Sequence, residues 1–213
     1  DNPEIAAYLR KFKKPIQTIA YGTEVVPFEL KAAELLEQFD LTSKQYHLHI
    51  GRVQPDNHVH EILSAAEDSG ETLVTIGDYS TRYGRTLKGA FDHCRNIHFL
   101  GSIYDKTILN ALRQHSLFYI HGHSAGGTNP ALLEALGCGC FVLAHGNPFN
   151  GSVLGGLGGL WVQSDQLSEL LQQRPGKEIL AQQQELAWER MKTHFQWKDI
   201  AAQYIDAFHE IGK

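Results

Sequence analysis

The chain has 213 residues, 42% of them hydrophobic, which predicts a folded globular protein with a substantial core and excludes a disordered chain. Its formal net charge of −5 offers no basic surplus to a nucleic-acid backbone, so we expect no nucleic acid among its partners. The longest apolar runs, such as Gly139–Ala144, are far shorter than the ~20 residues that span a bilayer, and no signal-like segment opens the chain, so we expect a cytoplasmic location.

Short apolar runs alternate with longer amphipathic segments, which is typical of strand–helix–strand units and a parallel sheet. Residues 1–14 are predicted to be a short basic helix that links domains, and residues 15–213 to be one α/β domain. Strands are expected near Ile16–Ala20, Tyr46–Ile50, Thr72–Ile76, Ile97–Leu100, Leu117–Ile120, Phe141–Ala144 and Gly159–Val162. Helices are expected near Glu29–Phe39, His58–Glu67, Tyr83–Cys94, Tyr104–Gln114, Pro130–Leu136 and Leu167–Gln173. The strands are almost continuously apolar, so helices should cover both faces of the sheet.

The chain is expected to be purely helical after Pro175, in two segments near Glu178–His194 and Trp197–Ile211. Two groups of residues are predicted to serve packing. The large aromatic side chains of this region are expected in the core: Trp188, Phe195, Trp197, Tyr204 and Phe208. The three cysteines show neither a disulfide framework nor a paired zinc spacing, so they are expected to be buried small residues: Cys94, Cys138 and Cys140.

The strand-to-helix turns are the places to search for a site, because an open α/β sheet binds its ligand beyond the carboxyl ends of the strands. In "GRVQPDN", Gly51 and Arg52 end a strand, and Asp56 or Asn57 can cap the next helix. Arg52 could then share an anion with the free N–H groups of that helix, or instead form a surface ion pair with Asp56. The residues alone do not favour either interpretation.

Two further turns carry weaker signals. Gly77-Asp78 follows a strand in a pattern that is common in α/β proteins, so we interpret it as mostly structural. Leu100-Gly101 ends an apolar strand before a new helix, an arrangement that could pack against a nucleobase while the backbone offers polar groups.

The segment "HGHSAGGTNP", residues 121–130, carries the most specific signal. Asn129 is a good N-cap, and Pro130 suits the first helical position. Gly126, Gly127 and Thr128 could bring bare N–H groups close to an anion at the positive end of that helix. We therefore predict an anion cradle formed by Gly126, Gly127, Thr128 and Asn129.

Three side chains flank this predicted cradle. Glu134 lies one turn into the helix, where a carboxylate suits sugar hydroxyls better than phosphate. His121 and His123 face the same side in an extended chain, but no third ligand has a suitable spacing and no Asp-x-Asp pair is present. We therefore expect no metal, and the two imidazoles either pack or contact a sugar or phosphate.

Three strings together resemble a known family: "GRVQPDN", the segment from "FLGSIYDK" through "HGHSAGGTNPALLEA" to "NPFN", and the closing "HFQWKDIAAQYIDAF". They are similar to the carboxyl-terminal, donor-binding domain of retaining glycosyltransferases with the GT-B fold, family 4 or group 1, in the bacterial rhamnosyltransferase-like branch. The resemblance covers about residues 19–208. It implies a Rossmann-like parallel sheet that closes with two helices.

The resemblance also implies roles for individual residues. Arg52 would bind the donor diphosphate beside Gly51, and Asn57 stands where most of the family has a lysine. Glu134 would hold the ribose, whereas Gly126 replaces a glutamate that usually contacts the sugar. His123, Ser124, Thr128 or Asn129 would then take over that contact. The residues implied in catalysis are Arg52, Glu134 and His123, those implied at the nucleoside are Leu100, Gly101 and Glu134, and no metal or other cofactor is expected.

The family's transferases run to about twice this length, so the resemblance implies an acceptor-binding amino-terminal domain outside this chain. The implied reaction transfers a sugar, possibly rhamnose, from a nucleoside-diphosphate donor to a polysaccharide, O-antigen or lipid-linked acceptor, with the intact enzyme peripheral at the inner membrane face. We expect the isolated domain to transfer sugar slowly or not at all. The alternatives are a non-catalytic sugar-nucleotide-binding or assembly domain and half of a related epimerase or phosphorylase.

Overall fold

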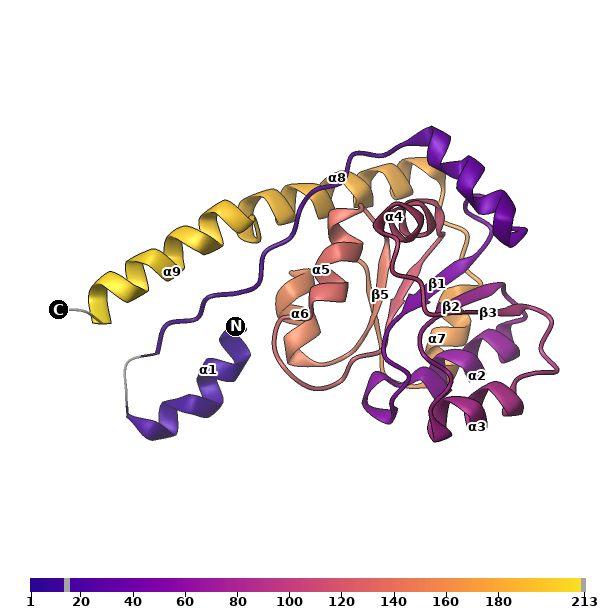
Figure 1. The fold of residues 1–213 in the computed structure, drawn as a ribbon, viewed down its shortest axis with the longest axis horizontal. Helices are drawn as coiled ribbons and strands as arrows, with labels where there is room; N and C mark the ends of the chain where they lie inside the picture. The colour runs from indigo at the N-terminus through magenta and orange to yellow at the C-terminus, as the bar shows by residue number, and fades with distance from the viewer. Residues whose placement is uncertain (14–15, 212–213) are drawn as a thin grey trace.

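The computed structural model describes residues 1–13 and 16–211 and contains one parallel sheet (Figure 1). Its six strands lie in the order β3-β2-β1-β4-β5-β6. Their bounds are β1 His47–Ile50, β2 Leu73–Ile76, β3 Ile97–Gly101, β4 Tyr119–His121, β5 Val142–His145 and β6 Gly159–Trp161. The order reverses between β1 and β4, which pair through Leu48 with Tyr119 and His49 with Ile120. The carboxyl ends of these two strands therefore flank the crevice where such folds bind ligands.

Helices cover both faces of the sheet. Those following the strands are α2 Val59–Ser69, α3 Arg82–Ala90, α4 Lys106–His115, α5 Pro130–Gly137, α6 Pro148–Leu154 and α7 Ser164–Leu171, and the chain ends in α8 Lys177–His194 and α9 Trp197–Ile211. The amino-terminal part contains α1 Pro3–Leu9 and the 3₁₀ helices η1 Arg10–Phe12 and η2 Leu30–Phe39, and a third, η3, spans Pro55–Asn57. No helix among the described residues has the length and apolar character needed to cross a bilayer.

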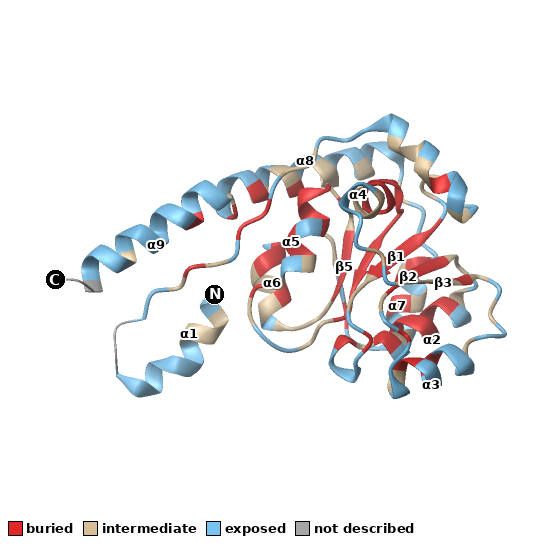
Figure 2. Cartoon of the chain, in the orientation of Figure 1, coloured by how far each residue is buried: buried red, intermediate tan, exposed pale blue. Residues whose placement is uncertain are grey.

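The core consists of two apolar layers, one on each face of the sheet, as the buried residues in Figure 2 indicate. One layer joins Leu48 and Val142 to Leu132 of α5 and Met191 of α8. The other layer contains Ile120 and Leu143 from neighbouring strands, with residues of α2 and α7. Successive strand residues point to opposite faces, so Tyr119 and Ile120 belong to different layers. This double coverage explains why the strands are mostly apolar.

The two ends of the chain lie outside these layers. Helix α1 packs against α6, and α9 extends away from the sheet (Figure 1). The segment after α1 runs back along the carboxyl-terminal helices, where Thr23 N donates to Phe195 O at 2.7 Å and forms an isolated bridge with Gln196. Val26 N donates to Gly137 O at 2.9 Å. This segment therefore uses the carbonyl groups at helix ends as its partners.

Six of the seven predicted strands are present, but the strand predicted at Ile16–Ala20 is wrong. Its sequence is apolar enough, yet no strand lies beside it, and a strand requires a hydrogen-bonding partner. The helix predicted at Glu29–Phe39 is the 3₁₀ helix η2, and α6 was not predicted, because Gly151 and two asparagines in "NPFNGSVL" weaken its helical signal. Predicted boundaries elsewhere differ by a few residues; α3, for example, ends at Ala90 rather than at Cys94.

Two packing predictions also need correction. Phe195 is buried as predicted, but Trp197, Tyr204 and Phe208 are 51%, 44% and 69% exposed because α9 extends beyond the layers that could cover it. Cys138 and Cys140 are buried, whereas Cys94 is only partly covered because it follows α3 near the surface.

Candidate functional site

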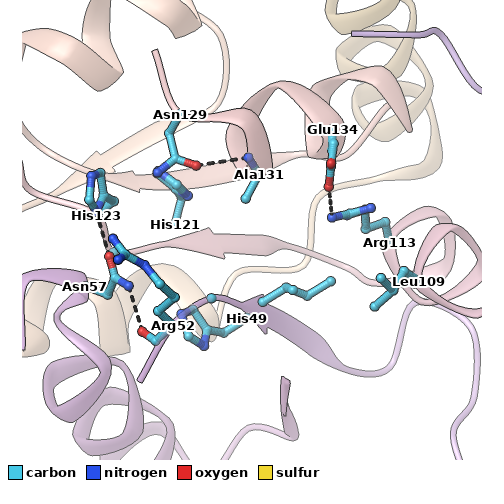
Figure 3. Close-up of a pocket in the computed structure, with 13 residues that line it drawn as sticks. His49, Arg52, Asn57, Leu109, Arg113, His121, His123, Asn129, Ala131 and Glu134 are labelled. Atoms are coloured by element: carbon cyan, nitrogen blue, oxygen red, sulfur yellow. Dashed lines mark hydrogen bonds and ion pairs between the residues drawn. The ribbon is translucent and has the colours of Figure 1, made fainter. Parts of the chain in front are cut away.

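A cavity of about 270 Å³ lies at the carboxyl ends of β1 and β4, where the strand order reverses (Figure 3). Its wall comes from the turns after the two strands, from α4 and from the first turns of α5. The lining residues are His49, Ile50, Gly51, Arg52, Asn57, Leu109, Arg113, His121, Gly122, His123, Asn129, Ala131 and Glu134. Of the residues predicted from the sequence, Gly51, Arg52, Asn57, His123, Asn129 and Glu134 are thus brought together.

The turn after β1 is tied to the turn after β4 through Asn57. Its Nδ2 donates to Arg52 O at 2.6 Å, and its Oδ1 accepts from His123 Nδ1 at 2.6 Å. The proton on Nδ1 leaves His123 Nε2 as an acceptor in the neutral ring. Burial lowers the pKa of His123, although the nearby Asp56 partly opposes this. A neutral His123 could therefore accept a hydrogen bond from a hydroxyl group in the cavity.

Arg52 is exposed at the mouth of the cavity. Within the described part of the chain its guanidinium makes no ion pair. The surface ion pair with Asp56, one of the two interpretations that the sequence allowed, is therefore not formed. The backbone oxygen of Asp56 accepts hydrogen bonds from Ser124 N and Oγ, both at 3.0 Å. The predicted capping of the next helix by Asp56 or Asn57 is wrong. Both belong to η3, and His58 is the N-cap of α2 with a positive φ of 49°.

Helix α5 begins as the sequence predicts, with the Asn129 side chain accepting from Ala131 N at 2.9 Å and Pro130 at the first helical position. Gly126, Gly127 and Thr128, however, do not line the cavity. Thr128 is buried and turned towards the amino terminus: its N–H donates to Asp1 Oδ1 at 3.3 Å, and its hydroxyl donates to Asp1 O at 2.6 Å. In this conformation the Asp1 carboxylate lies where the predicted cradle would receive an anion. The assignment of these three residues to a diphosphate stays a prediction.

The far end of the cavity contains an ion pair between Arg113 of α4 and Glu134 of α5 (Figure 3), with Nη2 and Oε2 2.5 Å apart. Arg113 is buried, whereas half of the Glu134 side chain is exposed. The pair also lines a neighbouring cavity of about 410 Å³ that includes Thr23, Tyr104 and Trp197. Arg113 and Glu134 thus form part of the wall between two hollows.

Two fully buried histidines form the floor. Burial lowers the pKa of His49 to about 4, and burial together with the neighbouring imidazoles of His123, His49 and His145 lowers that of His121 to about 3. Both rings are therefore neutral at pH 7. The Nδ1 atom of His49 lies 3.1 Å from Thr75 Oγ1, whereas His121 Nε2 is buried and finds no hydrogen-bond partner in the part of the chain that the structure describes. A neutral imidazole with a free ring nitrogen suits a hydroxyl or amide group better than a phosphate.

A cavity of about 370 Å³ adjoins the first one and shares the Ile50–Arg52 turn with it. Its wall includes Gly77, Asp78, Ser102, Ile103 and Tyr104. Leu100 and Gly101, predicted at the nucleobase, do not line it but immediately precede three residues that do. Gly101 has a positive φ of 70°, and its carbonyl oxygen accepts from Gly77 N at 2.9 Å.

Three residues of the cavity wall were not predicted from the sequence: His49, Leu109 and Arg113. His121 was predicted either to pack or to contact a sugar or phosphate, and it lines the cavity as a buried side chain. No sequence signal marked Arg113, because an arginine in the last turn of an amphipathic helix is usually solvated. His49 alternates with His47 in β1, and these polar interruptions of a buried strand were the signal that could have identified it.

Among the described residues, one group of His, Cys and acidic side chains is close enough together to share a metal ion. Its members are Glu67, His93 and Cys94, whose ligand atoms lie within 4.8 Å of one another. Glu67 lies in the last turn of α2, and His93 and Cys94 lie between α3 and the amino end of β3, away from the cavity at the carboxyl ends of the strands. This group is not part of the candidate site.

Comparison with known protein families and with curated proteins finds no match for this sequence. Solved structures do match it. One is Anabaena Alr3699/HepE in complex with UDP and glucose, with a TM-score of 0.77, 17% identity and coverage of 89% of this chain and 55% of that chain. Another is sucrose-phosphate synthase (tll1590) from Thermosynechococcus elongatus, with a TM-score of 0.80 and 19% identity; the match covers 99% of this chain and 57% of that chain. A third is the α,α-trehalose 6-phosphate synthase of Burkholderia multivorans, with a TM-score of 0.72 and 14% identity; the match covers 91% of this chain and 50% of that chain.

The chain thus spans about half the length of the solved structures that it matches. At these identities the likeness establishes the fold. The predicted architecture, a Rossmann-like parallel sheet with helices on both faces and two closing helices, as in the carboxyl-terminal half of a GT-B protein, is confirmed.

Proposed function

We propose that this chain is the donor-binding domain of a glycosyltransferase that uses a nucleoside-diphosphate sugar. The observation that carries the proposal is the cavity at the β1–β4 crevice, which has Arg52 on one side, its guanidinium without an ion pair among residues 1–13 and 16–211, and Glu134 of α5 on the other. The adjoining cavity shares the Arg52 turn and offers room for a flat base. Two similar structures add support: Anabaena Alr3699/HepE in complex with UDP and glucose, and the pneumococcal O-GlcNAc transferase GtfA in complex with UDP and GlcNAc.

In this proposal the diphosphate lies against Gly51 and Arg52, and Asn57 holds the Arg52 turn in place. The base lies in the cavity beyond Leu100 and Gly101, and Glu134 accepts from the ribose. His123 contacts the transferred sugar through its free Nε2. The loop formed by Gly126, Gly127 and Thr128 adds its N–H groups once Thr128 exchanges its contact with Asp1 for one with the donor.

The proposed reaction breaks the bond between the sugar and the diphosphate, with retention of configuration. Negative charge then builds up on the leaving diphosphate, and donors already aimed at it lower the barrier. Removing one such donor typically slows the reaction by about 100- to 1000-fold. Arg52 and the amino end of α5 supply this stabilisation, and the proposal includes no metal or other cofactor.

We further propose that a second, acceptor-binding domain completes the enzyme. Exposed apolar side chains on α9 and near the amino terminus offer it a surface: Tyr8, Phe12, Trp197, Tyr204, Ile205 and Phe208. The proposed sugar is rhamnose, and the proposed acceptor is a polysaccharide, O-antigen or lipid-linked glycan in the cytoplasm or at the inner membrane face. These finer assignments rest on the resemblance of the "HGHSAGGTNP" and "NPFN" motifs.

Calorimetric titration of the chain with UDP, GDP, ADP, dTDP and their sugars, with and without magnesium, tests the proposal. We expect one nucleotide to bind without magnesium. Arg52→Ala should weaken this diphosphate roughly 10- to 100-fold but leave the nucleoside almost unchanged, because a hydrogen bond to a charged group contributes about 1.5–3 kcal/mol. Arg95→Ala is the control, since Arg95 is exposed at the opposite edge of the sheet. Absence of binding, or equal losses for nucleoside and diphosphate, would contradict the proposal.

The second candidate function is sugar-nucleotide binding without catalysis, as in a sensor or assembly subunit. The state of Asn57 favours it: this side chain is neutral, and both of its polar atoms are engaged with Arg52 O and His123. It therefore adds no positive charge at the diphosphate. Joining the chain to its acceptor-binding domain discriminates the two candidates, because a catalytic domain would then transfer sugar and a binding domain would not.

A further inference from the structure

Glu67, His93 and Cys94 form a side-chain cluster outside the cavity that the proposed function does not use. Glu67 Oε1 accepts from His93 Nε2 at 2.7 Å and from Cys94 Sγ at 3.4 Å, and Sγ lies 3.5 Å from Nε2. An ionised carboxylate only accepts hydrogen bonds, so the ring nitrogen and the thiol both direct their protons at the same oxygen. One nitrogen, one sulfur and one oxygen thus converge on a single point.

The backbone around the cluster is held by contacts that do not involve the three polar groups. Asn96 Nδ2 donates to Ala66 O at 2.8 Å and to Glu71 O at 2.9 Å, so it ties the turn after α3 to the end of α2. Cys94 N donates to Phe91 O at 3.0 Å within that turn, and the Cys94 side chain packs against the apolar layer that includes α2. The two segments that supply the polar atoms are therefore already in place, which lowers the cost of binding a ligand between them.

The distances between the three atoms are close to those of one face of a tetrahedral zinc site. Zinc bonds of about 2.3 Å to sulfur and about 2.0–2.2 Å to nitrogen and oxygen place the sulfur about 3.5 Å from each of the other two ligands. The distances from Cys94 Sγ to Glu67 Oε1 and to His93 Nε2, 3.4 and 3.5 Å, match this value. The nitrogen and oxygen of such a site lie about 3.3 Å apart, so the 2.7 Å between Nε2 and Oε1 would have to increase by about 0.6 Å. Both side chains have room for this shift, because that of His93 is 68% exposed and that of Glu67 is 37% exposed.

We propose that Glu67, His93 and Cys94 bind a zinc ion that joins the last turn of α2 to the segment leading into β3. Thiolate and imidazole ligands suit zinc, whereas magnesium and calcium take oxygen ligands. The Glu67 carboxylate and the Cys94 thiolate together balance the two positive charges of the ion. On binding, the thiol proton passes to the solvent, and the neutral His93 ring keeps its proton on Nδ1, which leaves Nε2 for the metal.

Water takes the fourth position of this zinc, on the side where His93 and Glu67 are exposed. The ion lies away from the cavity and has no part in the proposed reaction. The inference is therefore independent of the proposed function, and either can fail without the other.

Calorimetric titration of the chelator-treated chain with Zn²⁺ and with Mg²⁺ tests the inference. We expect one equivalent of zinc to bind and magnesium not to bind. Titration with Co²⁺, which takes the same geometry, should produce a thiolate-to-cobalt absorption band in the near ultraviolet, which reports that a cysteine is a ligand. Zinc at about 100 times its dissociation constant should also raise Tm by roughly 5–10 °C.

Substitution of any of the three ligands should weaken zinc binding by about 10- to 100-fold or more, since even the loss of an outer-shell partner has an effect of this size. The variants are Glu67→Gln, His93→Gln and Cys94→Ser, and Cys94→Ser should also abolish the cobalt band. His209→Gln is the matched control, because His209 is likewise exposed but lies in α9. The exposed His93→Gln serves alone if another variant does not fold, as checked by circular dichroism.

Three results would overturn the inference. The first is a chain that binds no zinc, or that binds cobalt without the thiolate band. The second is zinc binding by His93→Gln or Cys94→Ser that is as tight as in the unaltered chain, because other surface groups would then hold the ion. The third is equal affinity for magnesium and zinc, because the ligands would then be carboxylates alone.

Discussion

Gly77→Ala should disturb the candidate site through the Arg52 turn, against which Gly77 packs in the wall of the adjoining cavity. Gly77 follows β2, and a Cβ atom added there would lie 2.5 Å from the carbonyl oxygen of Gly51 and 2.8 Å from Val53 Cγ2. Ordinary contacts begin at 3.4 Å, so the Gly51–Val53 segment would have to retreat by about 0.9 Å. Neither neighbour moves freely, since Gly51 N donates to Ile76 O at 3.1 Å and Val53 is buried. Arg52 lies between them and would move as well.

The magnitude follows from overpacking, which typically costs about 1–3 kcal/mol. In a protein of this size each kcal/mol lowers Tm by about 2–4 °C, so calorimetric unfolding should show a decrease of roughly 2–12 °C. The affinity for a nucleoside diphosphate should fall more than that for the nucleoside, because Arg52 is the group displaced.

Gly89→Ala provides the matched control for this substitution. Gly89 lies in α3, is exposed, and has open space where its Cβ would be. Alanine should therefore stabilise the chain there by up to ~1 kcal/mol through helix propensity alone. If Gly77→Ala behaves like Gly89→Ala in both stability and affinity, the steric reasoning about the Arg52 turn is refuted.

Two further predictions concern stability. Burial lowers the pKa of His47 and His49 to about 4, so below the unfolded value of 6.5 the unfolded chain binds more protons than the folded chain. The contribution of these two groups to the free energy of unfolding should be constant above about pH 7 and should fall by up to ~2 kcal/mol per imidazole between pH 6.5 and 5. Urea denaturation that shows greater stability at pH 5 would contradict this. Asn150→Ala should cost about 1–3 kcal/mol in the same assay, because Asn150 Nδ2 donates to His123 O and His145 O, both at 2.9 Å, and each hydrogen bond contributes about 0.5–1.5 kcal/mol. Asn147 Nδ2 donates to the same two carbonyl groups at 3.1 and 3.2 Å, so a cost below about 0.5 kcal/mol would mean that Asn147 alone satisfies them.

The six strands of the sheet were predictable because each lies in a short apolar run, and the central strands β2 and β4 are buried at every position. A run such as that around β5 can be apolar at every position only if helices lie on either side of it, and this pattern is visible without coordinates. The run at Ile16–Ala20 is apolar at its ends, with Gln17 and Thr18 between them, and forms no strand. Its composition carries no information on whether a neighbouring strand is available, and that depends on where the rest of the chain lies.

Some features of the candidate site were likewise predictable from the sequence, and others were not. Local chemistry predicted the start of α5, because Asn129 and Pro130 act on N–H groups within two residues of themselves. It predicted the Arg52 turn at the end of β1 for a similar reason. The orientation of Thr128 towards Asp1 was not predictable, because the two residues are 127 positions apart. The same holds for the contact of Arg113 with Glu134, which requires α4 and α5 to lie side by side.

The sequence by itself therefore determined the class of fold, the strands, and the turns where a ligand could bind, because periodicity, capping and glycine placement act over a few residues. Only the tertiary structure decided which of those turns share one cavity, which imidazoles are neutral and which charged side chain is buried. These properties depend on contacts between distant segments, and on a desolvation that exists only after the sheet and its helices have come together.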